Sequence, residues 1–575
     1  MQHIFDGDIR MSTEPHLWEQ SYPRGLKWAD PIRQSPLHMI LDNTISKFPH
    51  RPAFNFMGKK WTWDEVGALV NRMAKGLHDL GVERGSKVGI CLPNTPYFLI
   101  AYYAITKTGA TVVNFNPLYS ENELAHQIED SQTDMMITTD LCVVYDKMGK
   151  MLNDTRLNQL VICPFKDILP FPKNFLFPLL KSKDIATIPN DDRHVAFAKI
   201  IDNDGAFQAP HISATDDIAV LQYTGGTTGV PKGAMLTHAN ITANVEQVAH
   251  WLSNHAHAGQ EKIVGVIPFF HVFAMTAVMN LAVRYGFEIV ALPKFELEAT
   301  LKLIHNEKPH YLMAVPAIFN AINNSPLLSR YDLTSLRYCV SGGAPLPVEV
   351  RKKFEERTGC VVIEGYGLTE SSPVVCVNPP DGLNKAGSIG LPLAQTTVEL
   401  RDPETQLLVP LGERGELCVR GPQVMKGYWG KPDETAKVIM KDDFLRTGDV
   451  AVMDKDGFVF IVDRIKDLIL VNGYNVYPRN IEEAIYTHPC VEECIVAGIP
   501  DEQRGEAPKA WIKLKDGRQL SDTELKEFLK DKLSPIQMPR SIEFRDKPLP
   551  KTMIGKLSRK DVLAEDRSAQ PSPAP

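Results

Sequence analysis

A loop rich in glycine and threonine is the segment of this sequence best suited to binding phosphate. The string YTGGTTGVPKG (223–233) follows DIAVLQ (217–222), which has the composition of a buried strand. Its backbone N–H groups and hydroxyls can surround phosphate oxygens, and Lys232 adds a positive charge. Lys232 lies between a proline and a glycine, whereas a Walker loop needs glycine before the lysine and Ser or Thr after it. The loop therefore predicts polyphosphate binding, but not a kinase or a P-loop ATPase.

Oxygen-bearing and aromatic side chains further along the chain could complete a nucleotide site. Thr224 and Glu370 supply a hydroxyl and a carboxylate, which are the hard oxygen ligands that Mg²⁺ prefers. Tyr366 lies between two glycines, where its ring could stack on a base. Asp449 can accept two hydrogen bonds from ribose hydroxyls, with Arg464 as a second contact. These groups would suit a reaction at a nucleotide phosphate, because negative charge develops on the phosphorus oxygens in such a reaction.

Alternating strand and helix patterns indicate the elements that position these loops. KVGICLPN (87–94), PYFLIAYYAITKTGA (96–110) and TVVNFNP (111–117) predict a strand, a helix and a second strand. The same rhythm returns between residues 311 and 370, where apolar strands run into glycine-rich turns. Because parallel sheets bind ligands at the carboxyl ends of their strands, we expect the distinctive loops to meet there.

The predicted fold class is α/β, with more than one domain because the chain has 575 residues. A large N-terminal domain of layered α/β subdomains includes a β-rich subdomain from about residue 385, and a small mobile α+β domain follows it. The predicted boundaries are 1–34 for an N-terminal extension, 35–463 for the large domain, 464–563 for the small domain and 564–575 for a disordered, proline-rich tail.

One apolar stretch, residues 263–283, is long enough to resemble a membrane span. Pro268, His271 and Asn280 interrupt it. We therefore interpret it as a buried strand, a turn at the proline and a helix facing the core.

Composition limits the remaining classes of function. Hydrophobic residues make up 43% of the chain and charged residues 23%, as in globular proteins. A formal net charge of -7 gives no basic field for nucleic acid, so that partner is not expected. Nine dispersed cysteines indicate reduced thiols, and no basic segment with an apolar core opens the chain, so a cytoplasmic location is expected.

Five segments together resemble the adenylate-forming superfamily, which includes acyl-CoA synthetases, luciferases and peptide-synthetase adenylation domains. Besides the loop at 223–233 they are SGGAPLP (341–347), EGYGLTE (364–370), FLRTGDV (444–450) with DRIKDLILVNGYNVYPRNIEE (463–483), and PKTMIGKLSRK (550–560). The resemblance covers the chain from about residue 35 to 562, and the segments 365–379 and 467–483 are most similar to bacterial long-chain fatty acid:CoA ligases.

This resemblance implies a role for each matching residue. Lys556 would be the catalytic lysine that bridges the carboxylate and the α-phosphate, and Thr224 and Glu370 would hold or position the metal. Lys466 would be the hinge about which the small domain rotates, bringing Gly473 to the thiol tunnel. Residues 35–463 would bind the nucleotide. The full predicted set for nucleotide and coenzyme is Thr224, Gly225, Gly226, Thr227, Thr228, Gly229, Lys232, Gly343, Ala344, Pro345, Glu364, Gly365, Tyr366, Gly367, Thr369, Asp449, Arg464, Lys466 and Gly473.

The resemblance further implies an enzyme that uses ATP, Mg²⁺ and coenzyme A to activate a medium- to long-chain fatty acid as acyl-AMP and then as acyl-CoA. The string PFFHVFAMTAVMNLA (268–282) is apolar where the family lines its acyl pocket. Within it His271, included among the catalytic candidates, either shapes the tunnel mouth or caps a core turn.

The rival interpretations are an aryl-CoA ligase of the coumarate type, a fatty acyl-AMP ligase serving a carrier protein, and a catalytically silent lipid-binding protein. The sequence does not determine which acyl chain length is preferred, whether the protein forms a homodimer, or whether it contacts the inner membrane surface peripherally.

Overall fold

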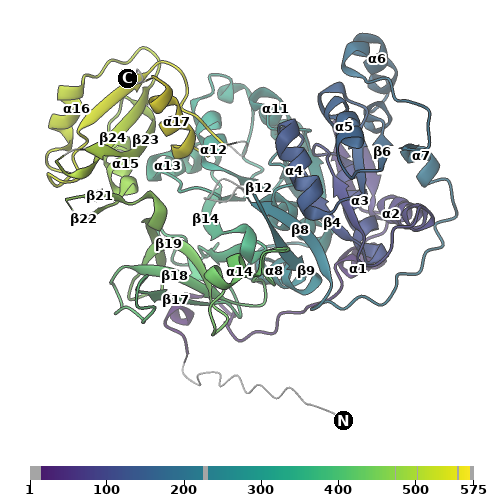
Figure 1. Ribbon diagram of the computed structural model, residues 1–575, viewed down its shortest axis with the longest axis horizontal. Coiled ribbons are helices and arrows are strands. Elements are labelled where there is room, and N and C mark those ends of the chain that lie inside the picture. Colours follow the sequence, from purple (N-terminus) through teal and green to yellow (C-terminus); the bar gives the residue numbers. More distant parts are fainter. Residues whose placement is uncertain (1–14, 225–230, 473, 502, 553–555, 570–575) are drawn as a thin grey trace.

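The computed structural model describes residues 15–224, 231–472, 474–501, 503–552 and 556–569 (Figure 1). Gly225, Gly226, Thr227, Thr228, Gly229 and Gly473, which are predicted to bind ligands, lie outside these residues. Within them the chain forms four sheets, two large and mostly parallel and two small.

The first large sheet has seven strands. They are, in spatial order, β7 (His194–Ala196), β6 (Gln159–Cys163), β5 (Met135–Thr139), β3 (Lys87–Ile90), β4 (Thr111–Asn114), β8 (Ile218–Thr224) and β9 (Lys232–Thr237). Neighbours pair in parallel except β8 and β9, which form an antiparallel hairpin. The connecting helices include α3 (Pro96–Thr108), α4 (Glu121–Ser131) and α5 (Cys142–Asp154). The strand, helix and strand predicted between residues 87 and 117 are confirmed.

The second large sheet has nine strands. They are β16 (Leu391–Pro392), β15 (Val374–Val377), β14 (Val361–Gly367), β13 (Tyr338–Ser341), β12 (Tyr311–Ala314), β10 (Lys262–Gly265), β11 (Glu288–Ala291), β1 (Pro52–Phe56) and β2 (Lys59–Thr62). The strands from β14 to β1 are parallel. Its helices are α8 (His238–Trp251), α11 (Leu297–Glu307), α12 (Pro316–Asn324) and α13 (Val348–Thr358). The predicted α/β class is confirmed.

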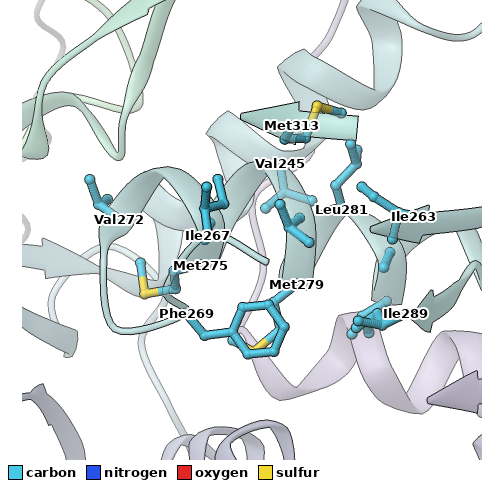
Figure 2. Packing of buried hydrophobic residues seen from close by; sticks show 14 of the residues in the cluster. Val245, Ile263, Ile267, Phe269, Val272, Met275, Met279, Leu281, Ile289 and Met313 are labelled. Carbon is cyan, nitrogen blue, oxygen red and sulfur yellow. The ribbon is translucent and has the colours of Figure 1, made fainter. Parts of the chain in front are cut away.

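The apolar stretch near residue 270 belongs to the core of this layer. After β10 it continues through α9 (Val272–Ala274), the π-helix η4 (Met275–Asn280) and α10 (Leu281–Tyr285). Figure 2 shows Met275 and Met279 packed with Phe269 beside Ile263 and Ile289 of the sheet. The predicted buried strand, turn and helix are confirmed. Among the described residues no helix is long and apolar enough to cross a membrane.

Helices near the N-terminus pack against β1 and β2 of the nine-stranded sheet and against α3. They include α1 (His38–Lys47) and α2 (Trp63–Asp79). Thr62 caps α2 by accepting a 3.2 Å hydrogen bond from the Glu65 N–H, and the Glu65 carboxylate accepts a 2.8 Å hydrogen bond from the Thr62 N–H. The segment that connects β6 to β8 contains, besides β7, the elements η2 (Phe165–Ile168), α6 (Lys173–Leu180), η3 (Ser182–Asp184) and α7 (Phe197–Ile200).

The β-rich subdomain is an antiparallel sheet of four strands. They are β17 (Thr397–Arg401), β18 (Gly415–Arg420), β19 (Leu445–Met453) and β20 (Val459–Arg464), with α14 (Pro432–Val438) beside them. Residues 15–34 of the predicted extension pack here through η1 (Leu17–Ser21). Trp18 is buried, and a side chain at Gly457 would lie 2.3 Å from its Cα. This part of the extension is therefore integral to the subdomain.

The C-terminal domain is an α+β unit, as predicted. Its sheet contains β22 (Tyr474–Val476), β21 (Ile469–Val471), β24 (Gly505–Leu514) and β23 (Val491–Asp501), and β25 (Ser541–Arg545) pairs with β24. Its helices are α15 (Pro478–Tyr486), α16 (Asp522–Leu529) and α17 (Arg559–Ala569).

The prediction of a disordered tail over residues 564–575 is wrong for residues 564–569. These residues belong to α17, because Val562 is buried against the domain and Asp566 forms an ion pair with Lys509 at 2.5 Å. Residues 570–575 lie outside the described part of the chain.

Candidate active site

Three strands of the nine-stranded sheet deliver their following loops to one place. His271 follows β10, Gly343 follows β13, and Glu370 follows β14 on the short helix η6 (Thr369–Ser371). These are the carboxyl ends of parallel strands, where sheets of this type bind ligands. The glycine-rich turns at 341–347 and 364–370 therefore follow β13 and β14 at this edge, and their joint role in binding stays a prediction.

Lys556 reaches this edge from the C-terminal domain. It lies beside Gly343, where an added Cβ would be 3.3 Å from Lys556 Cε and 4.0 Å from Nζ. Gly343 has a φ of +83°, so glycine suits both the backbone and the close approach. The turn that carries Lys556 is closed by a 2.6 Å hydrogen bond from the Thr552 N–H to the Lys556 carbonyl. The structure therefore places this remote lysine in the site formed by the large domain.

Burial controls the charge of two groups here. Burial and, to a lesser extent, the Arg464 guanidinium lower the pKa of Lys556 to about 8, although the Asp449 carboxylate opposes them. Burial and, to a lesser extent, the Lys556 ammonium together lower the pKa of His271 to about 4. At neutral pH the site thus contains a neutral imidazole beside a mostly protonated lysine.

His271 caps a core turn, which is one of the two roles considered for it from the sequence, and its role at a tunnel mouth stays a prediction. Its Nδ1 accepts a 3.3 Å hydrogen bond from the Phe273 N–H and so caps α9. Since Nδ1 accepts, the proton of the neutral ring lies on Nε2. The ring also lines a pocket with Ile267, Pro268, Phe273, Ala274, Val315 and Gly343.

That pocket lies where an acyl tunnel is expected, but its volume is only about 20 Å³, enough for about one water. Its walls are mainly apolar, and the π-helix η4 begins directly after Ala274. Methionines such as Met275 and Met279 repack readily because they are unbranched and flexible. A long acyl chain therefore requires side chains of this segment to move.

Asp449 organises a second group of predicted ligands. Tyr366 Oη donates to Asp449 Oδ2 at 2.5 Å, and Arg464 Nε donates to Asp449 Oδ1 at 2.9 Å. Asp449 and Arg464 pair directly across β19 and β20. Asp449 is buried, and Asp449 and burial together raise the pKa of Tyr366. The three residues that sequence reasoning assigned to adenosine are therefore brought together.

Glu370 is held by a residue that sequence reasoning missed. Tyr428 Oη donates to Glu370 Oε1 at 2.7 Å. The ring of Tyr428 also lies 5.2 Å from Lys232 Nζ, and Lys232 forms an ion pair with Glu434. Thr224 and Lys232 are paired residues at the loop end of the β8 and β9 hairpin. Tyr428 thus links the base of the glycine-rich loop to Glu370.

The donor set at this point suits Mg²⁺. Glu370 offers a carboxylate oriented by Tyr428, and η6 packs against β8, whose last residue is Thr224. Within the described ranges no group of three or more His, Cys, Asp or Glu side chains could hold a metal. Mg²⁺ characteristically binds through one or two protein oxygens, with substrate phosphates and waters as its other ligands. The residues present therefore fit this ion.

The remaining predicted residues of the two glycine motifs lie along the same edge. Glu364 is buried, its Oε1 accepts a 3.3 Å hydrogen bond from the Leu346 N–H, and burial raises its pKa to about 7. Ala344, Gly365 and Thr369 are half-buried, and Pro345 is exposed. A side chain at Gly367 would lie 2.1 Å from the Pro373 carbonyl oxygen, so this glycine is required by backbone packing. Glu364 therefore positions the loop that contains Gly343.

Lys466 lies in η7 (Ile465–Asp467), between the last strand of the β-rich sheet and the first strand of the C-terminal sheet. Its neighbour Asp467 accepts a 2.9 Å hydrogen bond from Arg559 Nη1, and Arg559 also binds both oxygens of Glu482. Arg559 was not singled out in the sequence, although it follows Lys556 closely. It ties the turn of Lys556 to the connection between the domains.

Comparison with known proteins agrees with this geometry. Residues 41–429 match the family model described as AMP-binding enzyme, and residues 480–556 match AMP-binding enzyme C-terminal domain. A protein of Bacillus subtilis named "Long-chain-fatty-acid--CoA ligase" is 44% identical over 552 residues, which cover 96% of this chain and 98% of that protein. A protein of the same name from Escherichia coli O157:H7 is 35% identical over 559 residues, with the same coverage.

Solved structures show the same architecture. ATP-bound MatB from Rhodopseudomonas palustris has a TM-score of 0.82 and 27% identity, covering 93% of this chain and 99% of that one. MenE from Bacillus subtilis, in complex with an acyl-adenylate intermediate, has a TM-score of 0.75 and 25% identity, covering 92% and 98%. Both family models and the full-length relatives lead to one conclusion: this chain belongs to the AMP-binding, adenylate-forming enzymes, in the group of the relatives named long-chain-fatty-acid--CoA ligase.

Proposed function

We propose that this chain is an AMP-forming fatty acid:CoA ligase that acts on long-chain acids. The carboxylate attacks the α-phosphate of ATP and displaces pyrophosphate, which gives acyl-AMP. The thiol of coenzyme A then attacks the acyl carbon and displaces AMP, which gives acyl-CoA. The observation that carries the proposal is the position of Lys556, which the C-terminal domain delivers to Gly343 and His271 at the strand ends.

Each residue of the site has a part in the first step. Lys556 Nζ donates to the attacking carboxylate and to the α-phosphate, where negative charge develops. Tyr366 stacks on the adenine, and Asp449 and Arg464 contact the ribose. Thr224 and Glu370 hold Mg²⁺, which when bound neutralises phosphate charge. His271 is neutral, so its Nε2 proton is available as a hydrogen-bond donor at the pocket mouth.

The acyl specificity follows from the lining of the pocket. Its residues are apolar apart from His271, and none carries the charge that would recognise an amino acid. The flexible methionine side chains of η4 can change rotamer to make room for an acyl chain. The same proposal includes coenzyme A as acceptor, reached through Gly473 after rotation about Lys466. A fatty acyl-AMP ligase would instead need a carrier protein for the second step.

The direct test is product analysis with purified protein, ATP and Mg²⁺. Palmitate and coenzyme A are expected to yield AMP, pyrophosphate and palmitoyl-CoA in equal amounts. Coumarate is expected to yield no AMP, and a phosphopantetheinylated carrier protein is expected not to replace coenzyme A. Palmitate bound without any release of pyrophosphate would identify a silent lipid-binding protein and overturn the proposal.

The depressed pKa of Lys556 predicts how adenylation depends on pH. The ammonium form is the competent donor, and it is lost as pH rises through a pKa of about 8 instead of near the usual lysine value of 10.5. We expect kcat/KM for ATP to fall about tenfold per pH unit above that point, because this parameter reports groups of the free enzyme. Acyl-AMP formation is measured without coenzyme A, whose thiol titrates in the same range. A Lys560→Ala variant, which lacks an exposed lysine four residues after Lys556, should show the same pH profile as the parent. A flat profile between pH 7 and 10 would contradict the assignment.

A further inference from the structure

The short helix α6 exposes the most concentrated apolar surface of the described chain. None of its residues is buried. Phe175 is 65% exposed, Leu179 76% and Leu180 76%, and the preceding Phe171 is 80% exposed. Large apolar side chains that are scattered singly over a surface need no explanation, but a contiguous group marks an interaction site. This group lies within the ten residues 171–180.

The helix is held in this exposed position by a defined anchor. Phe177 is its half-buried residue that packs on the core, with its ring centroid 5.3 Å from that of Phe165. The ring of Phe165 in turn packs against that of Phe56 in the nine-stranded sheet, with 5.9 Å between the ring centroids. In Figure 1, α6 stands at the outer end of the molecule, on the side opposite the C-terminal domain. The exposed rings are therefore presented outward and do not close over the site.

The surroundings of α6 are basic although the chain as a whole is acidic. Residues 165–184 contain four lysines and two aspartates, in a chain of net charge -7. Lys173 begins the helix, and Lys181 and Lys183 follow its end. Apolar side chains flanked by lysines match the boundary of a bilayer that contains anionic lipid, where acyl chains meet phosphate groups.

We propose that α6 and Phe171 dock this protein on the surface of an anionic lipid bilayer. Phe171, Phe175, Leu179 and Leu180 enter the boundary between headgroups and acyl chains, and the flanking lysines contact lipid phosphates. A second copy of the chain fits less well, because a twofold interface through α6 would set the same lysines against one another. The docking surface rests on the proposed function for its purpose, since long-chain acids partition into bilayers.

Vesicle binding tests the proposal directly. The full chain is sedimented with vesicles of phosphatidylcholine alone and with vesicles that contain equal parts of phosphatidylglycerol. Binding to the anionic vesicles is expected, and it should weaken as salt is raised. A Phe175→Ser/Leu179→Ser variant should bind at least about tenfold more weakly, because it removes two inserted side chains. A Lys173→Gln/Lys181→Gln variant should lose roughly fivefold or more, mainly at low salt.

A matched control comes from exposed leucines on another surface. Leu407 and Leu411 are 69% and 57% exposed in the connection between β17 and β18. A Leu407→Ser/Leu411→Ser variant should bind vesicles as the parent does. The α6 variants should keep the parent rate with dissolved octanoate, and lose rate only with palmitate supplied in anionic vesicles.

The outcomes separate this proposal from the proposed function. Equal vesicle binding by the parent and the Phe175→Ser/Leu179→Ser variant would overturn the docking surface. So would self-association of the parent that this variant abolishes, since it would show a second copy on α6. Failure to make any acyl-CoA from dissolved acids would refute the ligase, while vesicle binding would still decide the role of α6.

Discussion

Replacing Lys556 by alanine is expected to slow acyl-AMP formation by roughly 10²–10³-fold, the order found when one donor to a transition state is removed. The reason is the position of this lysine. Its Cε lies against the Gly343 turn, and Asp449 and Arg464 both act on its charge. Attack on the α-phosphate places new negative charge within reach of Nζ. The variant loses a donor that acts in this step alone.

Measuring the two half-reactions separately makes this prediction specific. Adenylation is followed by pyrophosphate release with palmitate and ATP, and thioester formation by the consumption of synthetic palmitoyl-AMP with coenzyme A. Lys556→Ala should slow the first and leave the second within about threefold of the parent, since thiol attack on the acyl carbon needs no donor to ATP. Lys560→Ala is the matched control and should leave both rates unchanged. An equal loss in both half-reactions would sink the assignment, because it would indicate general damage to the domain.

The parallel sheets could be predicted from sequence because their signals are local. A local sequence pattern of a few residues indicates each of these elements: the apolar strand at 87–94, the helix that ends at Gly109 and the strand at 111–117. No local sequence pattern indicates which strands lie side by side in a sheet or which of their residues pair. Phe54 of β1 is paired with Ile289 of β11, and only the burial of both strands selects that register.

The two ends of the chain illustrate why composition misleads. The segment at 564–569 is polar, yet Val562 and the ion pair of Asp566 with Lys509 fix it as helix. Trp18 stands in a polar N-terminal stretch and is nevertheless buried at Gly457. In both cases one or two anchoring residues decide the structure, so an average over the segment cannot reveal it.

The site could be predicted where a motif carries it and not where contacts are distant in sequence. Lys556, Asp449 and Tyr366 lie in recognisable strings, and the structure brings them to one edge. Tyr428 contacts Glu370 across 58 positions, and Arg559 contacts Glu482 across 77. Side chains joined over such separations leave no pattern in the sequence. For α6 the difficulty is opposite, because KNFLFPLL resembles a buried element and only the fold shows it exposed.

A proline at position 466 is expected to impair thioester formation roughly 10²-fold while adenylation stays within about threefold of the parent. The first value is of the order reached when a reacting group is misplaced. Lys466 is the central residue of η7, whose 3₁₀ conformation has φ near the value of about −65° that proline imposes. Proline therefore retains the arrangement in which Lys556 faces Gly343, and opposes the rotation that thiol entry requires.

Rigid coupling explains why one backbone angle has this effect. Arg559 binds Asp467 at 2.9 Å and Glu482 at 2.8 Å, and it therefore joins the segment of Lys556 to the proposed hinge and to α15. A fixed φ at residue 466 then holds the whole C-terminal domain in the adenylation position, and acyl-AMP accumulates. Rapid-quench analysis of palmitate, ATP and coenzyme A measures this accumulation. Lys466→Ala is the control, because it removes the side chain but leaves φ free, and it should consume acyl-AMP faster than the proline variant does. If formation and consumption of acyl-AMP fell together in the proline variant, residue 466 would not be the hinge, since a locked domain slows only the step that requires it to move.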